Sequence, residues 1–219
     1  MTEVRVDNQS PHLFGQTPWQ TVGPFFHYAL PWRGGADLAS ASELGARAEL
    51  FPPDHDRLNV APVREPPLGE PIEIVGRLID GAGEPVPDGL VEIWQADAQG
   101  RYPQWGDGPP DPNFPGFGRA ATGEDGGYRF RTILPGRVPG PGETLQAPHI
   151  AFSVLGRGLL KRLTTRLYFD GEEANERDPI LDHVPPDRRP TLIAQREAGG
   201  IWRFDIRLQG ERETVFFDL

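Results

Sequence analysis

The chain has no cysteine among its 219 residues, and this absence removes several classes of function. Disulfides, thiolate zinc sites, iron–sulfur clusters and cysteine nucleophiles all need a thiol that the protein lacks. Lysine is nearly absent too, because Lys161 stands alone, and 22 basic against 32 acidic residues give a formal net charge of −10. So acidic a protein is poorly suited to nucleic acid or to an anionic membrane surface, and we expect neither as a partner.

Long apolar runs are also missing. No stretch reaches the roughly 20 residues of a membrane-spanning helix, and residues 1–16 (MTEVRVDNQSPHLFGQ) lack the apolar segment of a secretory signal. We therefore expect a cytoplasmic protein, with residues 1–16 as a flexible arm.

Glycine, proline and aromatic residues are abundant. The 27 Gly and 25 Pro together approach the content at which disorder is suspected. However, 12 Phe, 5 Trp and 4 Tyr, with a hydrophobic fraction of 37%, are enough to build a packed core in a chain of this length. The composition favours an all-β domain with long, structured loops.

The first third of the chain is predicted to be irregular. Residues 1–70 contain an aromatic stretch, Thr17–Trp32, then a candidate short helix over Ala41–Leu50 and a proline-rich link over Phe51–Pro71. Leaving the aromatic side chains of Thr17–Trp32 in water would be costly, so we expect this segment to be functional or wrapped over a partner rather than a flexible arm. We therefore treat residues 1–70 as an N-terminal arm with a partner-contacting loop.

Residues 71–219 show strands and turns, and we expect them to form a β-sandwich. Turn residues at Asp80–Gly83 and, as the strongest hairpin signal, at Glu124–Gly127 separate apolar segments. A helix is expected near Asp187–Arg196, although Pro190 falls in its first turn. The expected strands are Ile72–Asp80, Leu90–Ala96, Tyr128–Ile133, His149–Leu155, Leu163–Phe169, Trp202–Leu208 and Thr214–Leu219. Seven short strands with little helix are typical of a sandwich.

No motif supplies a self-contained catalytic site. No two of the five histidines form H-x-H or H-E-x-x-H, and the nucleophile elbow, dinucleotide and phosphate-loop patterns are absent. Tyr102 and His149 stand out because each lies at a junction between a loop and a strand, where sandwiches carry sites. From placement alone, Tyr102 could equally anchor a loop and His149 could be a hydrogen-bonded, partly buried side chain.

Several sequence blocks, in the same order along most of the chain, resemble the intradiol ring-cleavage dioxygenases. The longest reads G-R-L-I-D-G-x-G-E-P-V-P-D-G-L-V-E-I-W-Q-A-D-A-Q-G-R-Y. The blocks are Thr17–Phe26, Gly76–Tyr102, Asp111–Arg119, Gly127–Gly136, Ala147–Ile150 and Arg203–Asp218. Within this family the first and last blocks look like the alpha-type chains of the two-chain enzymes that cleave protocatechuate.

The resemblance implies a degenerate iron site. A catalytic chain of the family holds one non-haem ferric ion with two tyrosines and two histidines. Tyr102 matches the first tyrosine and His149 the first histidine, whereas the second tyrosine falls on Val138 and the second histidine on Ala151. Two remaining ligands cannot hold ferric iron in a competent site. The implied Fe(III) therefore belongs to a homologous beta chain, and this chain is expected to bind no metal and to be inactive alone.

The resemblance also implies that this chain lines the substrate pocket of its partner in an αβ hetero-oligomer acting on protocatechuate and O2. The positions carried over are Thr21, Gly23, Pro24 and Arg157. Gly23 would allow a close backbone approach, Pro24 would present a rigid apolar face, and Thr21 would offer a hydroxyl. Arg157 would offset the substrate carboxylate.

Two other functions stay open at this point. The runs Val86–Ile93 and Gly123–Gly136 also resemble transthyretin-like sandwiches, which are shorter non-enzymatic binding modules. A homo-oligomeric dioxygenase could instead use Tyr102 and His149 with further ligands.

Overall fold

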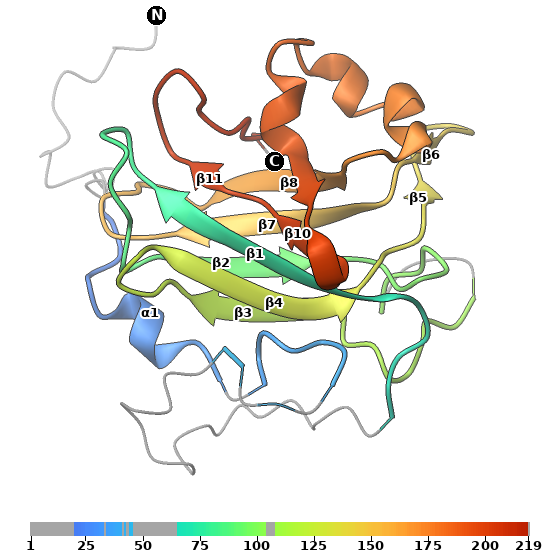
Figure 1. Ribbon diagram of the computed structural model, residues 1–219, viewed down its shortest axis with the longest axis horizontal. Coiled ribbons are helices and arrows are strands. Elements are labelled where there is room, and N and C mark those ends of the chain that lie inside the picture. Colours follow the sequence, from blue (N-terminus) through green and yellow to red (C-terminus); the bar gives the residue numbers. More distant parts are fainter. Residues whose placement is uncertain are drawn as a thin grey trace, which may run out of the picture.

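The computed structural model describes residues 20–32, 34–40, 42, 44–45, 65–103 and 108–218. Most of its regular structure is β-strand (Figure 1). The strands of the main sheet are β1 (Pro71–Ile79), β2 (Leu90–Trp94), β3 (Phe117–Ala121), β4 (Gly127–Ile133), β7 (His149–Leu155), β8 (Leu163–Phe169), β9 (Ile193–Arg196), β10 (Ile201–Arg203) and β11 (Ile206–Arg207). A separate small hairpin pairs β5 (Val138–Pro139) with β6 (Leu145–Gln146).

The helices of the described residues are short. They are the α-helix α1 (Phe26–Ala29) and the 3₁₀ turns η1 (Glu173–Arg177), η2 (Leu181–His183), η3 (Arg189–Leu192) and η4 (Ala198–Gly200). None of the described helices has the length and apolar character needed to cross a membrane.

One continuous sheet folds over to form the sandwich. Strands β3, β2, β7 and β8 make one layer, and β4, β1, β10 and β11 make the other. Strand β9 joins the layers, because it runs parallel to β8 and antiparallel to β10. The expected β-sandwich is therefore confirmed, with nearly barrel-like closure on the side of β9.

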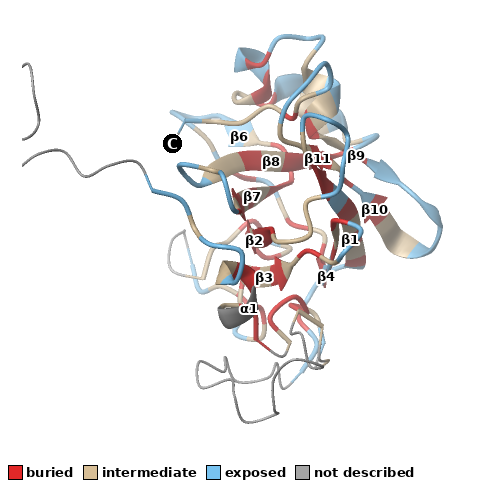
Figure 2. Ribbon diagram, turned by 90° about the vertical axis from the view of Figure 1, so that its left-hand side faces the viewer, coloured by how far each residue is buried: buried red, intermediate tan, exposed pale blue. Residues whose placement is uncertain are grey.

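The hydrophobic core lies between the two layers. Alternate residues point inward, and Figure 2 shows the buried positions concentrated on the facing strands. Aromatic rings fill much of the space, as where Phe130 of β4 meets Phe152 of β7 edge to face at 6.3 Å. Since Ile150 and Phe152 point into the core, His149 and Ala151 of the same strand project from the opposite face.

The helix expected over Asp187–Arg196 is wrong. Residues 189–192 form the 3₁₀ turn η3, with Pro190 in its first positions, and Ile193 begins strand β9. Proline cannot donate the hydrogen bond that would continue a helix. Pairing of Ala194 with Phe169 of β8 then recruits the following residues into the sheet.

Two other strand predictions need correction. The single strand expected over Trp202–Leu208 is split into β10 and β11, because the Phe204 amide bonds to the Val75 carbonyl and the Asp205 carboxylate accepts from the Arg77 amide. The strand expected over Thr214–Leu219 does not form, and the described part, residues 214–218, makes one isolated bridge to β8.

The turn predictions are confirmed in position, but one is wrong in what it connects. The turn at Glu124–Gly127 joins β3 to β4, which pair with β2 and β1 in different layers and not with each other. The helix expected over Ala41–Leu50 does not run through Leu44 and Gly45, which form a turn with Gly45 at φ +108°. Other residues of that range lie outside the described part of the chain.

The N-terminal segment packs in part against this chain's own sandwich. Leu38 lies in the core, and its amide donates to the carbonyl of Arg131. Arg119 of β3 holds the preceding residues, donating to the Leu30 carbonyl at 3.2 Å and stacking on the Trp32 ring. Residues 20–25 extend beyond this attachment, and Phe25 is 74% exposed.

Candidate functional site

Thr21 and Arg157, far apart in sequence, lie together in space. The Thr21 hydroxyl accepts a hydrogen bond from the Gly158 amide at 2.9 Å and donates to the Gly156 carbonyl at 3.4 Å. These contacts attach the N-terminal loop to the turn between β7 and β8, which carries Arg157. Two of the pocket residues expected from the sequence thus share one surface.

Arg157 is held by an acidic neighbour at its inner end. Its Nε lies 3.1 Å from the Asp88 carboxylate. The Asp88 side chain is only 12% exposed, whereas that of Arg157 is 61% exposed. Because this ion pair uses Nε, the two terminal nitrogens can still form a bidentate contact with an incoming carboxylate.

Gly23, Pro24 and Phe25 form an exposed surface beside Thr21. The loop turns back on itself where the Phe26 amide bonds to the Gly23 carbonyl at 3.2 Å. A Cβ atom added at Gly23 would meet no atom of the described residues within 4 Å, its two chain neighbours aside. The absence of a side chain at this position therefore serves no packing need of the described residues. Trp19, also expected to contact a partner, lies outside them.

The four positions mapped to the iron site surround one end of β7. Cross-strand pairing places Ala151 between Trp94 of β2 and Arg166 of β8. Tyr102 stacks on Trp94, with ring centroids 5.7 Å apart and planes at 12°. His149 lies two residues before Ala151 on the same face of the strand.

Val138 reaches this neighbourhood from the β5–β6 hairpin. It is buried, with 4% of its surface exposed, and pairs with Gln146. The Gln146 side chain in turn accepts a hydrogen bond from Arg166 Nη1 at 2.6 Å. The structure thus brings Tyr102, Val138, His149 and Ala151 into one cluster with Arg166.

His149 is buried and neutral at physiological pH. Its Nδ1 lies 2.8 Å from the Ala147 carbonyl, which is the geometry of an N–H donor. The pKa of His149 is lowered from 6.5 to about 4, mainly by burial and then by the positive charge of Arg166, against weaker opposing effects of the Ala147 hydrogen bond and of Asp178. Its ring lies against Tyr168 at 5.7 Å.

This neutral histidine should make stability depend on pH. The folded pKa lies below the unfolded value, so the unfolded chain binds the proton more readily between these values. The free energy of unfolding is therefore expected to fall by up to about 3 kcal/mol as the pH drops from about 6.5 to about 4. Urea denaturation across this range should show a flatter pH dependence for His149→Asn. Equal slopes in both proteins would contradict the expectation.

The sequence of this chain is similar to those of known dioxygenases. Residues 48–210 match the sequence profile of Dioxygenase_C, a dioxygenase family. The chain is 42% identical over 212 residues to the protocatechuate 3,4-dioxygenase alpha chain of Burkholderia cepacia, covering 93% of this chain and 98% of that relative. The chain belongs to the intradiol dioxygenase family.

The intradiol dioxygenase relatives include both chains of one enzyme. The beta chain of Burkholderia cepacia is also 42% identical, but over 178 residues and 76% of each chain. Among solved structures, the dioxygenase domain of a carbohydrate-binding fusion from Streptomyces sp. SirexAA-E matches with a TM-score of 0.52 and 32% identity, covering 68% of this chain and 82% of that one. These findings confirm the family inferred from the sequence blocks.

The intradiol family is iron-dependent, but the residues at these positions of this chain do not fit ferric iron. Tyr102 and His149 are the two donors, while Val138 and Ala151 supply none. Burial raises the pKa of Tyr102 above its ordinary value of 10. Among the described residues, no group of three or more histidine, aspartate or glutamate side chains could hold a metal.

Arg166 and Asp88 are functional candidates that the sequence did not reveal. Arg166 lies within an ordinary strand segment, L-T-T-R-L-Y-F, and only the register against Ala151 shows its importance. Asp88 lies in a P-D-G turn, where aspartate is common for local reasons. No signal in a single sequence distinguishes either residue from its neighbours.

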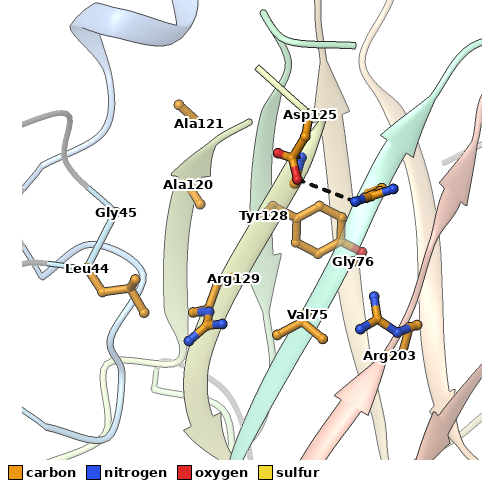
Figure 3. Close-up of a pocket in the computed structure, with 12 residues that line it drawn as sticks. Leu44, Gly45, Val75, Gly76, Ala120, Ala121, Asp125, Tyr128, Arg129 and Arg203 are labelled. Atoms are coloured by element: carbon orange, nitrogen blue, oxygen red, sulfur yellow. Dashed lines mark hydrogen bonds and ion pairs between the residues drawn. The ribbon is translucent and has the colours of Figure 1, made fainter. Parts of the chain in front are cut away.

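A second surface feature lies away from these clusters. An open pocket of about 500 Å³ is lined by parts of β1, β3 and β4 with Leu44, Gly45 and Arg203 (Figure 3). Three arginines line it, yet each has a carboxylate partner: Arg77 with Asp125, Arg129 with Glu73, and Arg203 with Glu197. The pocket contains none of the site residues expected from the sequence, and we assign it no function.

Proposed function

We propose that this chain is the non-iron alpha subunit of a protocatechuate 3,4-dioxygenase and completes the active site of a homologous beta chain. The enzyme would cleave the C3–C4 bond of protocatechuate and add both atoms of O2, giving 3-carboxy-cis,cis-muconate. This places the protein in aromatic catabolism through the beta-ketoadipate pathway. The cytoplasmic location expected from the sequence belongs to the same proposal.

The juxtaposition of Thr21 with Arg157 carries the proposal. Both lie on an exposed surface, although more than 130 residues separate them, and the structure holds them together through hydrogen bonds at 2.9 and 3.4 Å. A surface that is built but unused within the chain is typical of one that acts on a neighbour. The near-complete match to an alpha chain, against 76% coverage for a beta chain, supports the same assignment.

In this proposal the residues of this chain bind and orient the substrate. Ring opening needs the ferric iron, which we place in the beta chain. The exposed edge of Arg157 would accept the substrate carboxylate, while Asp88 holds its inner nitrogen and fixes its direction. Gly23 and Pro24 would form an apolar wall against the ring, and Phe25 would pack on the partner.

The two competing functions are less well supported. A transthyretin-like module would be shorter, and it would not account for a match over 93% of the chain. A homo-oligomeric dioxygenase would need a full ligand set around Tyr102 and His149, whereas their described neighbours include the Arg166 cation.

Co-expression tests the proposal. The chain purified alone should contain no iron and should not consume O2 with protocatechuate. Expressed with a protocatechuate 3,4-dioxygenase beta chain, it should co-purify as a burgundy, active complex with iron in proportion to the beta chain. An iron-containing chain that turns over alone, or a monomer indifferent to every beta chain tried, would overturn it.

Gly23 gives a sharper prediction. Because a methyl group there would meet nothing in the described part of the chain, Gly23→Ala should change the free energy of unfolding of the uncomplexed chain by less than about 0.5 kcal/mol. In the αβ complex the same methyl group would intrude on the substrate, and kcat/KM should fall about tenfold. Denaturation of the chain and steady-state O2 uptake by the complex measure the two effects. Full activity in a stable complex would show that Gly23 does not approach the substrate.

A further inference from the structure

The N-terminal loop that carries Gly23 is attached to the sandwich on both of its sides. Before Gly23, the Thr21 hydroxyl accepts a hydrogen bond from the Gly158 amide in the turn between β7 and β8. After it, the short helix α1 leads to Leu30, whose carbonyl accepts a hydrogen bond from the Arg119 side chain of β3. The position of the exposed residues between these attachments therefore depends on both of them.

The Arg119 side chain contacts a neighbouring strand and the N-terminal loop at the same time. Its Nε donates at 2.8 Å to the carboxylate of Glu92, the residue that pairs with it on β2. Its Nη1 donates to the Leu30 carbonyl at 3.2 Å. Only 19% of the Arg119 side chain and 16% of the Glu92 side chain are exposed. Because a guanidinium presents its donors in a fixed plane, the contact with Glu92 also fixes the direction of the donor to Leu30.

Aromatic rings confine the same guanidinium. Trp32, from the N-terminal segment, stacks on Phe117 of β3 with ring centroids 6.0 Å apart. The Cζ atom of Arg119 lies 5.4 Å from the centre of each ring. Trp32 is buried, and the attraction between a cation and an aromatic ring is stronger where water is excluded. The backbone adds to this attachment, since the Arg119 amide donates to the Gly35 carbonyl at 2.7 Å.

A short, hydrogen-bonded segment connects this attachment with Gly23. Helix α1 covers Phe26–Ala29 directly before Leu30, and the Phe26 amide closes the preceding turn on the Gly23 carbonyl at 3.2 Å. The His27 side chain of the same helix is buried. A displacement of Leu30 would therefore reach Gly23 through one turn of helix and one backbone turn.

We propose that Arg119 is a positioning residue for the substrate pocket, because it holds Leu30 and Trp32 and thereby fixes where Gly23 and Pro24 lie. This inference rests on the function proposed above. In that pocket, Gly23 and Pro24 form the wall against the ring, which protocatechuate and catechol share. Loss of the Arg119 attachment should therefore impair both substrates alike.

Hydrogen exchange in the uncomplexed chain tests the attachment by itself. Arg119→Met keeps a long apolar side chain but loses the donated hydrogen bonds and the charge. Exchange of the amides of residues 20–30, followed by mass spectrometry, should become about tenfold faster. The matched control is Arg129→Met, which breaks an ion pair with Glu73 in the other layer and should leave these amides unchanged. Equal exchange in the two variants would overturn the inference without involving any beta chain.

Steady-state kinetics of the αβ complex test the positioning. Arg119→Met should lower kcat/KM about tenfold for protocatechuate and for catechol, with iron content and sedimentation of the complex unchanged. Arg119→Lys keeps the charge but cannot bridge Glu92 and Leu30 at once, so it should lose about threefold. The lysine variant also decides the matter if the methionine variant does not fold.

The outcomes separate this inference from the proposed function. Unchanged kcat/KM in an Arg119 variant with fast exchange would overturn the inference alone, since Arg157→Gln still tests the proposed function. A chain that joins no beta chain would overturn the proposed function, and the inference with it.

A double-mutant cycle gives a readout that a purely structural role would not change. Gly23→Ala alone is expected to lower kcat/KM about tenfold, because the substrate then meets a methyl group on a fixed loop. Once Arg119→Met frees the loop, the same methyl group should be accommodated, and its effect should shrink to about twofold. Additive losses would show that Arg119 stabilises the chain without positioning Gly23, and the inference would be wrong.

Discussion

Replacing Arg157 by glutamine in the αβ complex is expected to raise the KM for protocatechuate by about 10- to 100-fold. This is the loss expected when a charged hydrogen-bonding partner of a carboxylate is removed. The guanidinium is exposed and is held through Nε by Asp88, so glutamine removes the carboxylate contact without disturbing a packed core. The effect should fall mainly on KM, because binding and orientation are the role assigned to this chain.

Two controls make this result specific. Arg162→Gln changes an exposed arginine a few residues further along the same turn and should leave KM unchanged. Catechol lacks the carboxylate, so the KM for catechol should respond little to Arg157→Gln. If Arg157→Gln lowered activity equally with both substrates, the cause would be damage to the αβ interface. If it left the KM for protocatechuate unchanged, Arg157 would not contact the substrate.

The strands of the fold could be predicted where each buries its own alternating face. The ranges expected for β7 and β8 agree with the structure at both ends, because HIAFSVL and LTTRLYF contain the residues that pack into the core. Strand β3 was missed because its sequence, FGRAA, has small residues in place of an apolar stripe. It forms by pairing with β2, and Gly118 leaves room for Leu38, so tertiary context decides it.

The candidate sites, like the strands, could be predicted from the sequence only in part. Thr21 and Arg157 could be named from sequence only through a family resemblance, whereas Tyr102 and His149 also stood out by their places at junctions between a loop and a strand. Their grouping into two clusters depends on distances that no spacing encodes, such as the contact of Thr21 with Gly158 at 2.9 Å. Arg166 and Asp88 become visible only when the strand register and the turn geometry are known.

The Thr21–Arg157 cluster and the cluster around His149 lie at opposite ends of β7. We expect only the first to take part in the reaction. The turn after Leu155 carries Arg157, which we expect to face a partner, while His149 at the other end belongs to the cluster that maps onto the family's iron site. The proposed division of labour needs no change in the fold, only different side chains at a few positions.

The largest effect on stability is expected from Gly76→Ala in the centre of β1. Gly76 pairs with Tyr128 of β4 (Figure 3). The Tyr128 hydroxyl donates a hydrogen bond to the Phe204 carbonyl. A methyl group at Gly76 would lie 1.8 Å from that carbonyl oxygen and 2.6 Å from the tyrosine hydroxyl. Backbone on one side and a buried ring on the other leave no direction in which it could relax.

The variant should therefore lose about 3–5 kcal/mol of unfolding free energy, because overpacking and a broken buried hydrogen bond add together. For a chain of this size that lowers Tm by roughly 10 °C. Tyr128→Phe separates the two causes, since it removes the hydrogen bond alone and should cost about 1–2 kcal/mol. Gly23→Ala is the matched control, because its methyl group meets no atom among the residues that the structure describes. If Gly76→Ala had the same Tm as Gly23→Ala, the close approach of β1 to Phe204 would be disproved. The reason given for glycine at this position would then be wrong.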